Sequence, residues 1–252
     1  MAMHFGPGLD PAYKFKLYRF SVWTGLIVAL ANTVSFFMMQ ELFPPPEPLL
    51  SAAENYDFLM RRRDMILWGT ILMGLVAPFY YFFSVITSMQ LRRIEGEFGL
   101  LSYLQITTAV VAPTGWLYPL ATLSSAVYRV DRAPELVQMM SDNYWLTYVG
   151  VAAIFSINQI AVGLAVLGDR RKDPVFPRWF GYMNFFFALA FAPGVFVYAF
   201  QDGPLAWNGT FTLYIPSTAF PLWLGMMTWG LLRAVKQEER EEMAARTAAG
   251  VA

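Results

Sequence analysis

The sequence contains no cysteine and only one histidine, His4, in 252 residues. The chain therefore cannot form a disulfide, a thiolate zinc or iron–sulfur site, or a cysteine nucleophile, and it cannot offer two imidazoles to a haem. We accordingly predict no metal and no cofactor. Charged residues are also scarce, at 14% of the chain, whereas they make up about 25% of an ordinary soluble domain.

The few charges are balanced, since eighteen Lys and Arg residues stand against eighteen Asp and Glu residues. No overall positive field exists to attract nucleic acid, so we predict no nucleic-acid partner. Apolar residues make up 57% of the sequence and aromatic residues 17%. This composition is typical of a protein whose surroundings are the lipid bilayer.

Long apolar windows give the expected fold. A helix needs about 20 mostly apolar residues to cross the hydrocarbon core of a bilayer. Six windows meet this requirement and keep their charges at the ends, namely residues 20–43, 65–91, 100–128, 143–168, 178–201 and 209–235. The sequence therefore predicts an all-α polytopic membrane protein. A six-transmembrane-helix bundle forms a single integral membrane domain over residues 1–252, with a charged helical tail over 236–252.

The distribution of basic residues predicts the orientation of these spans. Thirteen of the eighteen Lys and Arg residues fall on one side, formed by the N-terminus, the connections 92–99 and 169–178, and the C-terminal tail. The positive-inside rule places that side, and hence both termini, in the cytoplasm. The arginine run 61–63 is the main exception, and acidic residues beside it offer partners for ion pairs.

Two exterior connections are long enough to form short interfacial helices. After three prolines at 44–46, Ser51 and Glu54 have the spacing of a capping box, which predicts a helix that starts at Ser51 and runs into the second span. In the other connection, the segment 131–140 has Pro134 and Glu135 in the first turn of a predicted short helix.

Small and amide residues recur every three or four positions along the predicted spans. In one interpretation these stripes only pack the helices, because small residues allow close approach. In the other, the amides line a cavity and orient the polar end of an apolar ligand. The residues proposed for that second role are Asn32, Gln105, Gln159 (or its neighbour Asn158) and Asn184.

Prolines interrupt four of the six predicted spans, at positions 78, 113, 119, 193, 216 and 221. Each proline removes a backbone donor and favours a kink, and kinks across a bundle open space between helices. The aromatic side chains near these prolines either line that space or form lipid-facing belts. Among them, Tyr81, Trp116 and Tyr214 are the proposed ligand-binding residues.

Catalytic candidates are limited to carboxylates near the exterior boundary. They are Glu41, Asp131, Glu135, Asp142 and Asp202. Two of them at the mouth of the bundle would form a general acid–base pair for an apolar substrate. The sequence leaves open whether the protein is an enzyme.

Three segments, 131–136, 176–184 and 203–209, together resemble a family of six-span bacterial integral membrane proteins that has no assigned function. The resemblance covers about residues 100–235. It implies a multi-pass protein of the bacterial inner (plasma) membrane, and it implies no activity and no site residue.

The leading hypothesis is a protein that binds or passes an apolar small molecule, such as a lipid, steroid, isoprenoid or hydrocarbon, in an intramembrane cavity. The main alternative is a non-catalytic accessory subunit of a larger membrane complex, with a membrane protein partner or a second copy on its small-residue stripes and exterior hairpins. A further alternative is an intramembrane enzyme that uses the boundary carboxylates.

Overall fold

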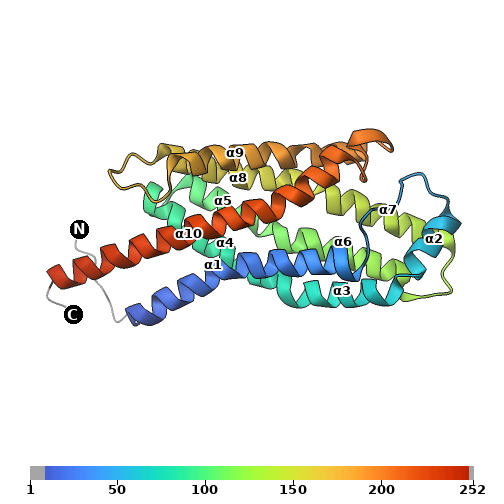
Figure 1. Cartoon of the computed structure of the whole chain (residues 1–252), viewed down its shortest axis with the longest axis horizontal. Coiled ribbons are helices and arrows are strands. Elements are labelled where there is room, and N and C mark those ends of the chain that lie inside the picture. The colour runs from blue at the N-terminus through green and yellow to red at the C-terminus, as the bar shows by residue number, and fades with distance from the viewer. Residues whose placement is uncertain (1–8, 250–252) are drawn as a thin grey trace.

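A computed structural model describes residues 9–249, and within them every regular element is helical. Figure 1 shows an elongated bundle in which the first described helix begins, and the last one ends, at the same end. We call this the termini end of the bundle. The short helix α2 (Ala52–Met60) lies at the opposite end.

Each predicted span corresponds to a rod made of one or more helical segments. In chain order, the rods are α1 (Pro11–Thr33) with η1 (Val34–Met39); α3 (Arg63–Val76) with η2 (Ala77–Phe79) and α4 (Tyr80–Glu95); α5 (Leu100–Ala109) with α6 (Val111–Tyr128); α7 (Pro134–Gly150) with α8 (Ala152–Gly168); α9 (Arg178–Phe191) with η3 (Ala192–Tyr198); and η5 (Thr210–Tyr214) with α10 (Ile215–Ala248). The charged tail continues the last rod as a helix, as expected.

Four of these rods are long and apolar enough to cross a membrane: Pro11–Met39, Arg63–Glu95, Pro134–Gly168 and Arg178–Tyr198. The rods from windows 100–128 and 209–235 lie in the same bundle but are not among the four. Proline, threonine and tyrosine recur in both windows and dilute their apolar character. The fold is therefore all-helical with four candidate spans.

The capping box at the start of α2 is confirmed. Ser51 Oγ accepts a hydrogen bond from Glu54 N at 3.4 Å, and Ser51 N donates to Glu54 Oε2 at 2.9 Å. A turn separates α2 from α3, so the helix does not run on as expected.

The second exterior helix differs from its prediction, because segment 131–140 does not form a short separate helix. Helix α7 starts at Pro134 and continues unbroken to Gly150. Neither proline nor glycine occurs between these two residues to end the helix. The predicted surface helix and the following span are therefore one rod.

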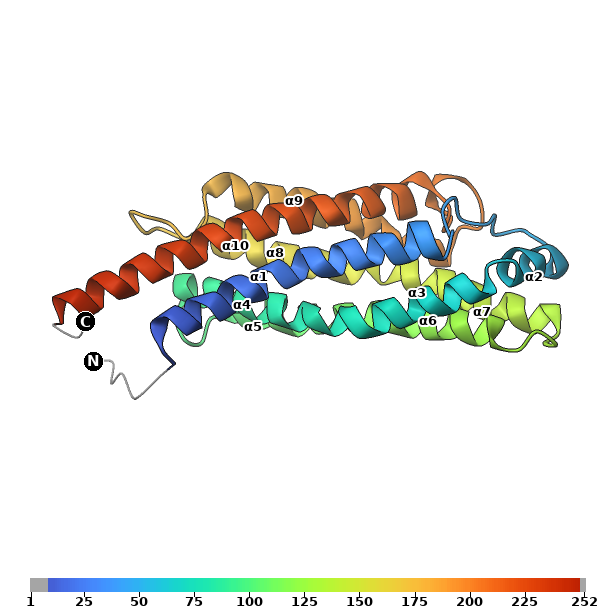
Figure 2. The same ribbon diagram turned by 60° about the horizontal axis from the view of Figure 1, so that its bottom comes forward.

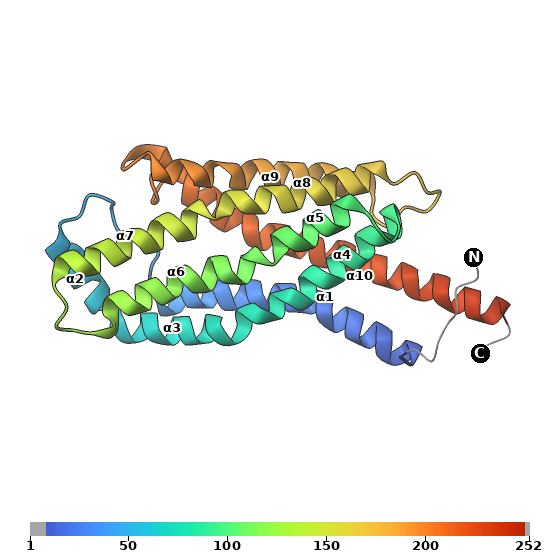
Figure 3. The same ribbon diagram turned by 180° about the vertical axis from the view of Figure 1, so that it is seen from behind.

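Proline explains where two of the rods change direction. The missing N–H of Pro113 leaves the carbonyl of Ala109 without its helical partner, and α5 ends at Ala109. Pro78 lies in the 3₁₀ turn η2, which joins α3 to α4. These irregularities bend the rods but keep them in the bundle (Figure 3).

Packing places the first and last described helices side by side. Helix α1 contacts both α10 and α4, while α8 packs against α9 and α5, and α6 packs against α7. Figure 2 shows α1 beside α10 along much of its length. The largest fully buried side chains include Trp145, Trp223 and Tyr80, so aromatic residues fill much of the core.

Candidate functional site

The bundle contains a cavity of about 80 Å³ in the half away from the termini. Its walls come from the outer end of α1 with η1, from α6, from the junction of α7 and α8, from the end of α9, and from η5 with the start of α10. No single helix pair makes this site, because segments from across the whole chain converge on it.

The rods depart from regular α-helix where they reach the cavity. Helix α1 widens into the π-helical segment η1, which contributes Phe36 and Phe37. Helices α7 and α8 are interrupted at Val151, which itself lines the cavity. The last rod begins with a second π-helical segment, η5, followed by Pro216 and Pro221. Such departures from α-helical geometry are frequent at functional sites.

Aromatic rings form most of the wall. Trp116 of α6 stacks on Phe155 of α8 with ring centroids 6.2 Å apart, and its edge meets Phe220 of α10 at 5.6 Å. On the other side, Phe36 stacks on Tyr148 at 5.5 Å with nearly parallel planes. These contacts fix the rings against one another and give the cavity a stiff, largely apolar lining.

A few polar groups interrupt this lining. Tyr148 Oη donates to Asn32 Oδ1 at 3.4 Å, a long hydrogen bond that joins α7 to α1. The hydroxyl of Thr33 donates to the Ala29 carbonyl at 2.9 Å. In the described part of the chain, Asn32 Nδ2 and the Ser217 hydroxyl, both in the lining, have no protein partner. The cavity therefore keeps donors for an acceptor oxygen on a ligand.

The cavity opens sideways between the first and last rods. Among its lining residues, only Thr33 of α1 and Pro221 of α10 are exposed. The two belong to neighbouring helices. An opening at this place lies on the flank of the bundle and not at its ends.

Two of the seven predicted ligand-binding residues, Asn32 and Trp116, line this cavity. Tyr214 stands just outside it, exposed, with its ring 5.2 Å from that of Phe43. Tyr81 is exposed on α4 and lines a separate groove. The structure thus brings only part of the predicted set to this cavity.

The remaining three predicted amides are buried away from this cavity. Asn184 is fully buried and hydrogen-bonded between α9 and α10. Gln105 of α5 and Gln159 of α8 are also buried, and neither side chain is satisfied: Gln105 Oε1 and both polar atoms of Gln159 have no partner. Their neighbour Asn158 donates to the Gln105 carbonyl at 3.0 Å.

Sequence reasoning missed Tyr148 and Phe155, which flank the interruption at Val151. No proline or glycine occupies Val151 itself, and the break follows Gly150. That glycine fits closely against the next rod: a Cβ there would lie 2.2 Å from Tyr198 Oη. The only local sign of the break between α7 and α8 is that Gly150 precedes the β-branched residue Val151.

The exterior carboxylates do not meet at the cavity. Glu41 lies 3.9 Å from Arg62 in an ion pair, and Glu135 and Asp142 share an open groove along α7. None of the five lines the cavity. Over residues 9–249, no group of three or more His, Asp or Glu side chains is arranged to hold a metal ion.

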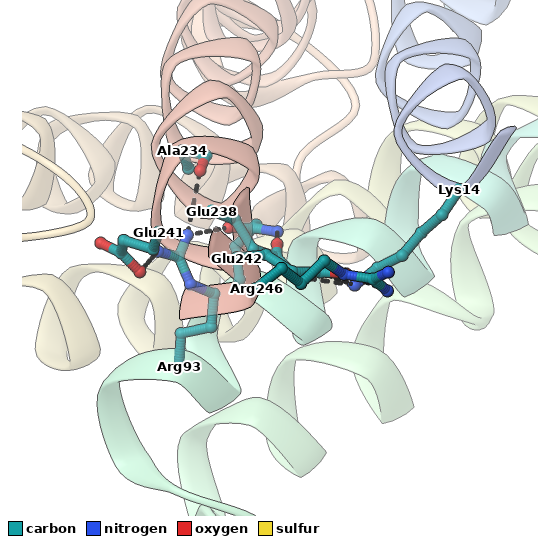
Figure 4. Close-up of polar contacts among 8 residues, drawn as sticks. Lys14, Arg93, Ala234, Glu238, Glu241, Glu242 and Arg246 are labelled. Atoms are coloured by element: carbon teal, nitrogen blue, oxygen red, sulfur yellow. Dashed lines mark hydrogen bonds and ion pairs between the residues drawn. The ribbon is translucent and has the colours of Figure 1, made fainter. Parts of the chain in front are cut away.

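A second polar feature lies at the termini end, where the tail of α10 is tied to α1 and α4 (Figure 4). Lys14 pairs with Glu242 and reaches Glu238 at 3.9 Å, and Arg93 Nη2 donates to Glu241 at 2.9 Å while its Nη1 bonds the Ala234 carbonyl.

Partial burial alone would raise the pKa of the Glu242 carboxyl. Hydrogen bonds and charge from Lys14 and Arg246 outweigh it and leave this pKa below its ordinary value. This ion-pair cluster is structural, since its acids and bases are already paired with one another.

Comparison with protein-family models, with curated proteins and with solved structures finds no match for this chain.

Proposed function

We propose that this protein binds an apolar small molecule in the cavity between its first and last rods. The observation that carries the proposal is the convergence of irregular helices on an aromatic-walled cavity with a sideways entrance at Thr33 and Pro221. A bundle selected only for packing has no need of such a space, because membrane helices associate best in close contact.

The proposal includes the membrane topology expected from the sequence. It places six spans in a bacterial inner membrane, with both termini in the cytoplasm. Four sufficiently apolar rods, and two more that pack among them, support the spans. The position of most basic residues near the termini end supports the cytoplasmic side proposed for both termini. In this orientation the cavity lies in the outer half of the membrane.

The size of the cavity narrows the ligand class. About 80 Å³ is roughly half of the ~150 Å³ cavity that accepts benzene in an engineered protein core. A four-ring steroid does not fit without rearrangement. A slender molecule fits better: the end of an acyl, isoprenoid or hydrocarbon chain enters between α1 and α10, and the rest stays in lipid. An acceptor oxygen on such a molecule would bind Asn32 Nδ2.

The test is native mass spectrometry of protein extracted gently from its own membrane, followed by organic extraction of whatever co-purifies. The variant Ser217→Leu fills the cavity, and its control is Thr218→Leu on the exposed neighbouring position. We expect a stoichiometric apolar molecule in the wild type and in Thr218→Leu, and its loss in Ser217→Leu. Equal retention by both variants would contradict the proposal.

The same experiment addresses the alternative function. A stoichiometric membrane protein partner, with no small molecule in the wild type, would identify the chain as an accessory subunit of a larger complex. In that case both leucine variants should keep the partner, because the cavity would have no part in assembly.

A further inference from the structure

A second apolar groove lies on the flank of the bundle between α1 and α4, with a volume of about 320 Å³. Its walls include Leu17 and Ser21 of α1, and Phe82, Val85 and Met89 of α4. Phe82 and Val85 are almost half exposed, at 44% and 46%. The groove is therefore an open channel along the surface, and it shares no lining residue with the cavity described above.

The groove runs toward the termini end. Helices α1 and α4 are antiparallel neighbours, so the N-terminal part of α1 lies beside the C-terminal part of α4. Met89 is the groove residue nearest the end of α4, and Leu17 is the one nearest the start of α1. A chain-like molecule in the groove would thus have one end at the level where α1 begins and α4 ends.

Each of the two helices has an exposed cation near this end of the groove. Arg92 is one helical turn beyond Met89, on the same stripe of α4. Lys16 is one turn before Phe20, whose ring meets groove residue Phe82 at 5.7 Å. Helical spacing thus places both cations near the termini end of the groove.

Several neighbouring bases have ion-pair partners, whereas these two do not. Lys14 and Arg246 pair with Glu242, Arg19 pairs with Glu239, and Arg93 pairs with Glu241. Among residues 9–249, neither Lys16 nor Arg92 has an ion-pair partner. The termini end of the groove thus has two cations without an ion-pair partner beside an apolar channel.

We infer that this groove holds an anionic phospholipid of the cytoplasmic leaflet, with an acyl chain along α4 and its phosphate between Lys16 and Arg92. The inference rests on the membrane topology proposed above and is independent of the cavity. A zwitterionic lipid offers the same acyl chain, but its headgroup has no net negative charge to match the two cations.

The test is native mass spectrometry of the purified chain titrated with phosphatidylglycerol or with phosphatidylcholine of the same acyl length. We expect tighter retention of phosphatidylglycerol by the wild type. The double variant Lys16→Gln/Arg92→Gln should lower that preference about thirtyfold. The matched control is Arg170→Gln/Lys172→Gln, which removes two exposed cations from the α8–α9 connection. It should leave the preference unchanged.

A second pair of variants tests the groove itself. Val85→Trp fills the channel, and Leu164→Trp adds the same side chain at a similarly exposed position on α8. Only Val85→Trp should lose the retained phosphatidylglycerol. Equal retention by these two variants, or no preference between the lipids in the wild type, would overturn the inference. Ser217→Leu should not alter phosphatidylglycerol binding, which separates this site from the cavity.

Discussion

The indole nitrogen of Trp223 on α10 donates a hydrogen bond to Oδ1 of Asn184 on α9, 3.1 Å away. Asn184 Nδ2 in turn donates to the Phe180 carbonyl at 2.9 Å. Both side chains are buried, at 0% exposure for Asn184 and 1% for Trp223. The amide that sequence reasoning assigned to a ligand therefore joins two rods of the protein.

Replacing this amide should weaken the fold. In Asn184→Leu, the buried indole N–H of Trp223 loses its acceptor, and we expect a loss of about 1–3 kcal/mol in the free energy of unfolding. Reversible unfolding in detergent measures it. The double variant Asn184→Leu/Trp223→Phe should regain part of the loss, because no buried donor is then left unpaired. An unchanged stability in the single variant would contradict this assignment.

Gln159 differs from Asn184 because its buried amide has no hydrogen-bond partner. It is 0% exposed, and neither its oxygen nor its nitrogen has a hydrogen-bond partner. Since a buried unpaired polar group costs about 1–3 kcal/mol, Gln159→Leu should leave the protein equally stable or more stable. Thermal unfolding in detergent tests this expectation. A clear loss of stability would mean that the amide has a bound partner, in agreement with the ligand-binding role predicted for it.

Two glycines should respond in opposite ways to alanine. A Cβ on Gly194 would lie 2.7 Å from the Val149 carbonyl oxygen, a backbone atom that cannot move aside easily, so Gly194→Ala should push η3 off α7 and destabilise the bundle. Gly225 in α10 has no atom within 4 Å of such a Cβ. Gly225→Ala should therefore stabilise α10 by about 0.5–1 kcal/mol. Thermal unfolding of the two variants tests this. Equal shifts in melting temperature would contradict the close packing at Gly194 and the open space at Gly225.

Asp169, in the connection after α8, should make the stability of the fold depend on pH. Burial by itself would raise the pKa of this carboxyl, but hydrogen bonds from Arg171 and from the Val175 N–H outweigh that effect and lower it. The ionised form is thus favoured by folding. Its contribution to the free energy of unfolding is present above about pH 4, the pKa of the unfolded state. This contribution is lost as the pH falls through the lower pKa of the folded state.

Asp169→Asn should remove that dependence. We expect it to lower stability at neutral pH by about 2 kcal/mol, because the charged acceptor is lost. The difference from wild type should shrink as pH falls below about 4. Melting curves at several pH values provide the check. A difference that stays constant down to pH 3 would show that the carboxylate is not the cause.

Much of the fold could be predicted from the residues alone. The spacing of Ser51 and Glu54 predicts a capping box at the start of α2, and the structure contains it. The interleaved charges after Arg233 predict a helical tail, and α10 runs to Ala248. These features depend on spacing within a few residues, and such local spacing can be read directly in the sequence.

The cavity could be predicted only in part. Gln159 and Asn158 differ by one position, yet only Asn158 faces a partner, because one residue turns a helix by about 100°. The stripes of small and amide residues are compatible with several rotations of each rod. Asn32 and Trp116 line the cavity, whereas Tyr214 does not, although its chain neighbour Leu213 does.

The sequence by itself determined the helical, membrane-like character of this protein, since apolar length, capping residues and charge placement act locally. Only the tertiary structure decided which side chains meet. Tyr148 of α7 reaches Asn32 of α1, two residues that are 116 positions apart in the chain. Such a contact depends on the mutual rotation of rods far apart in the chain, and these rotations follow from the packing of the whole bundle.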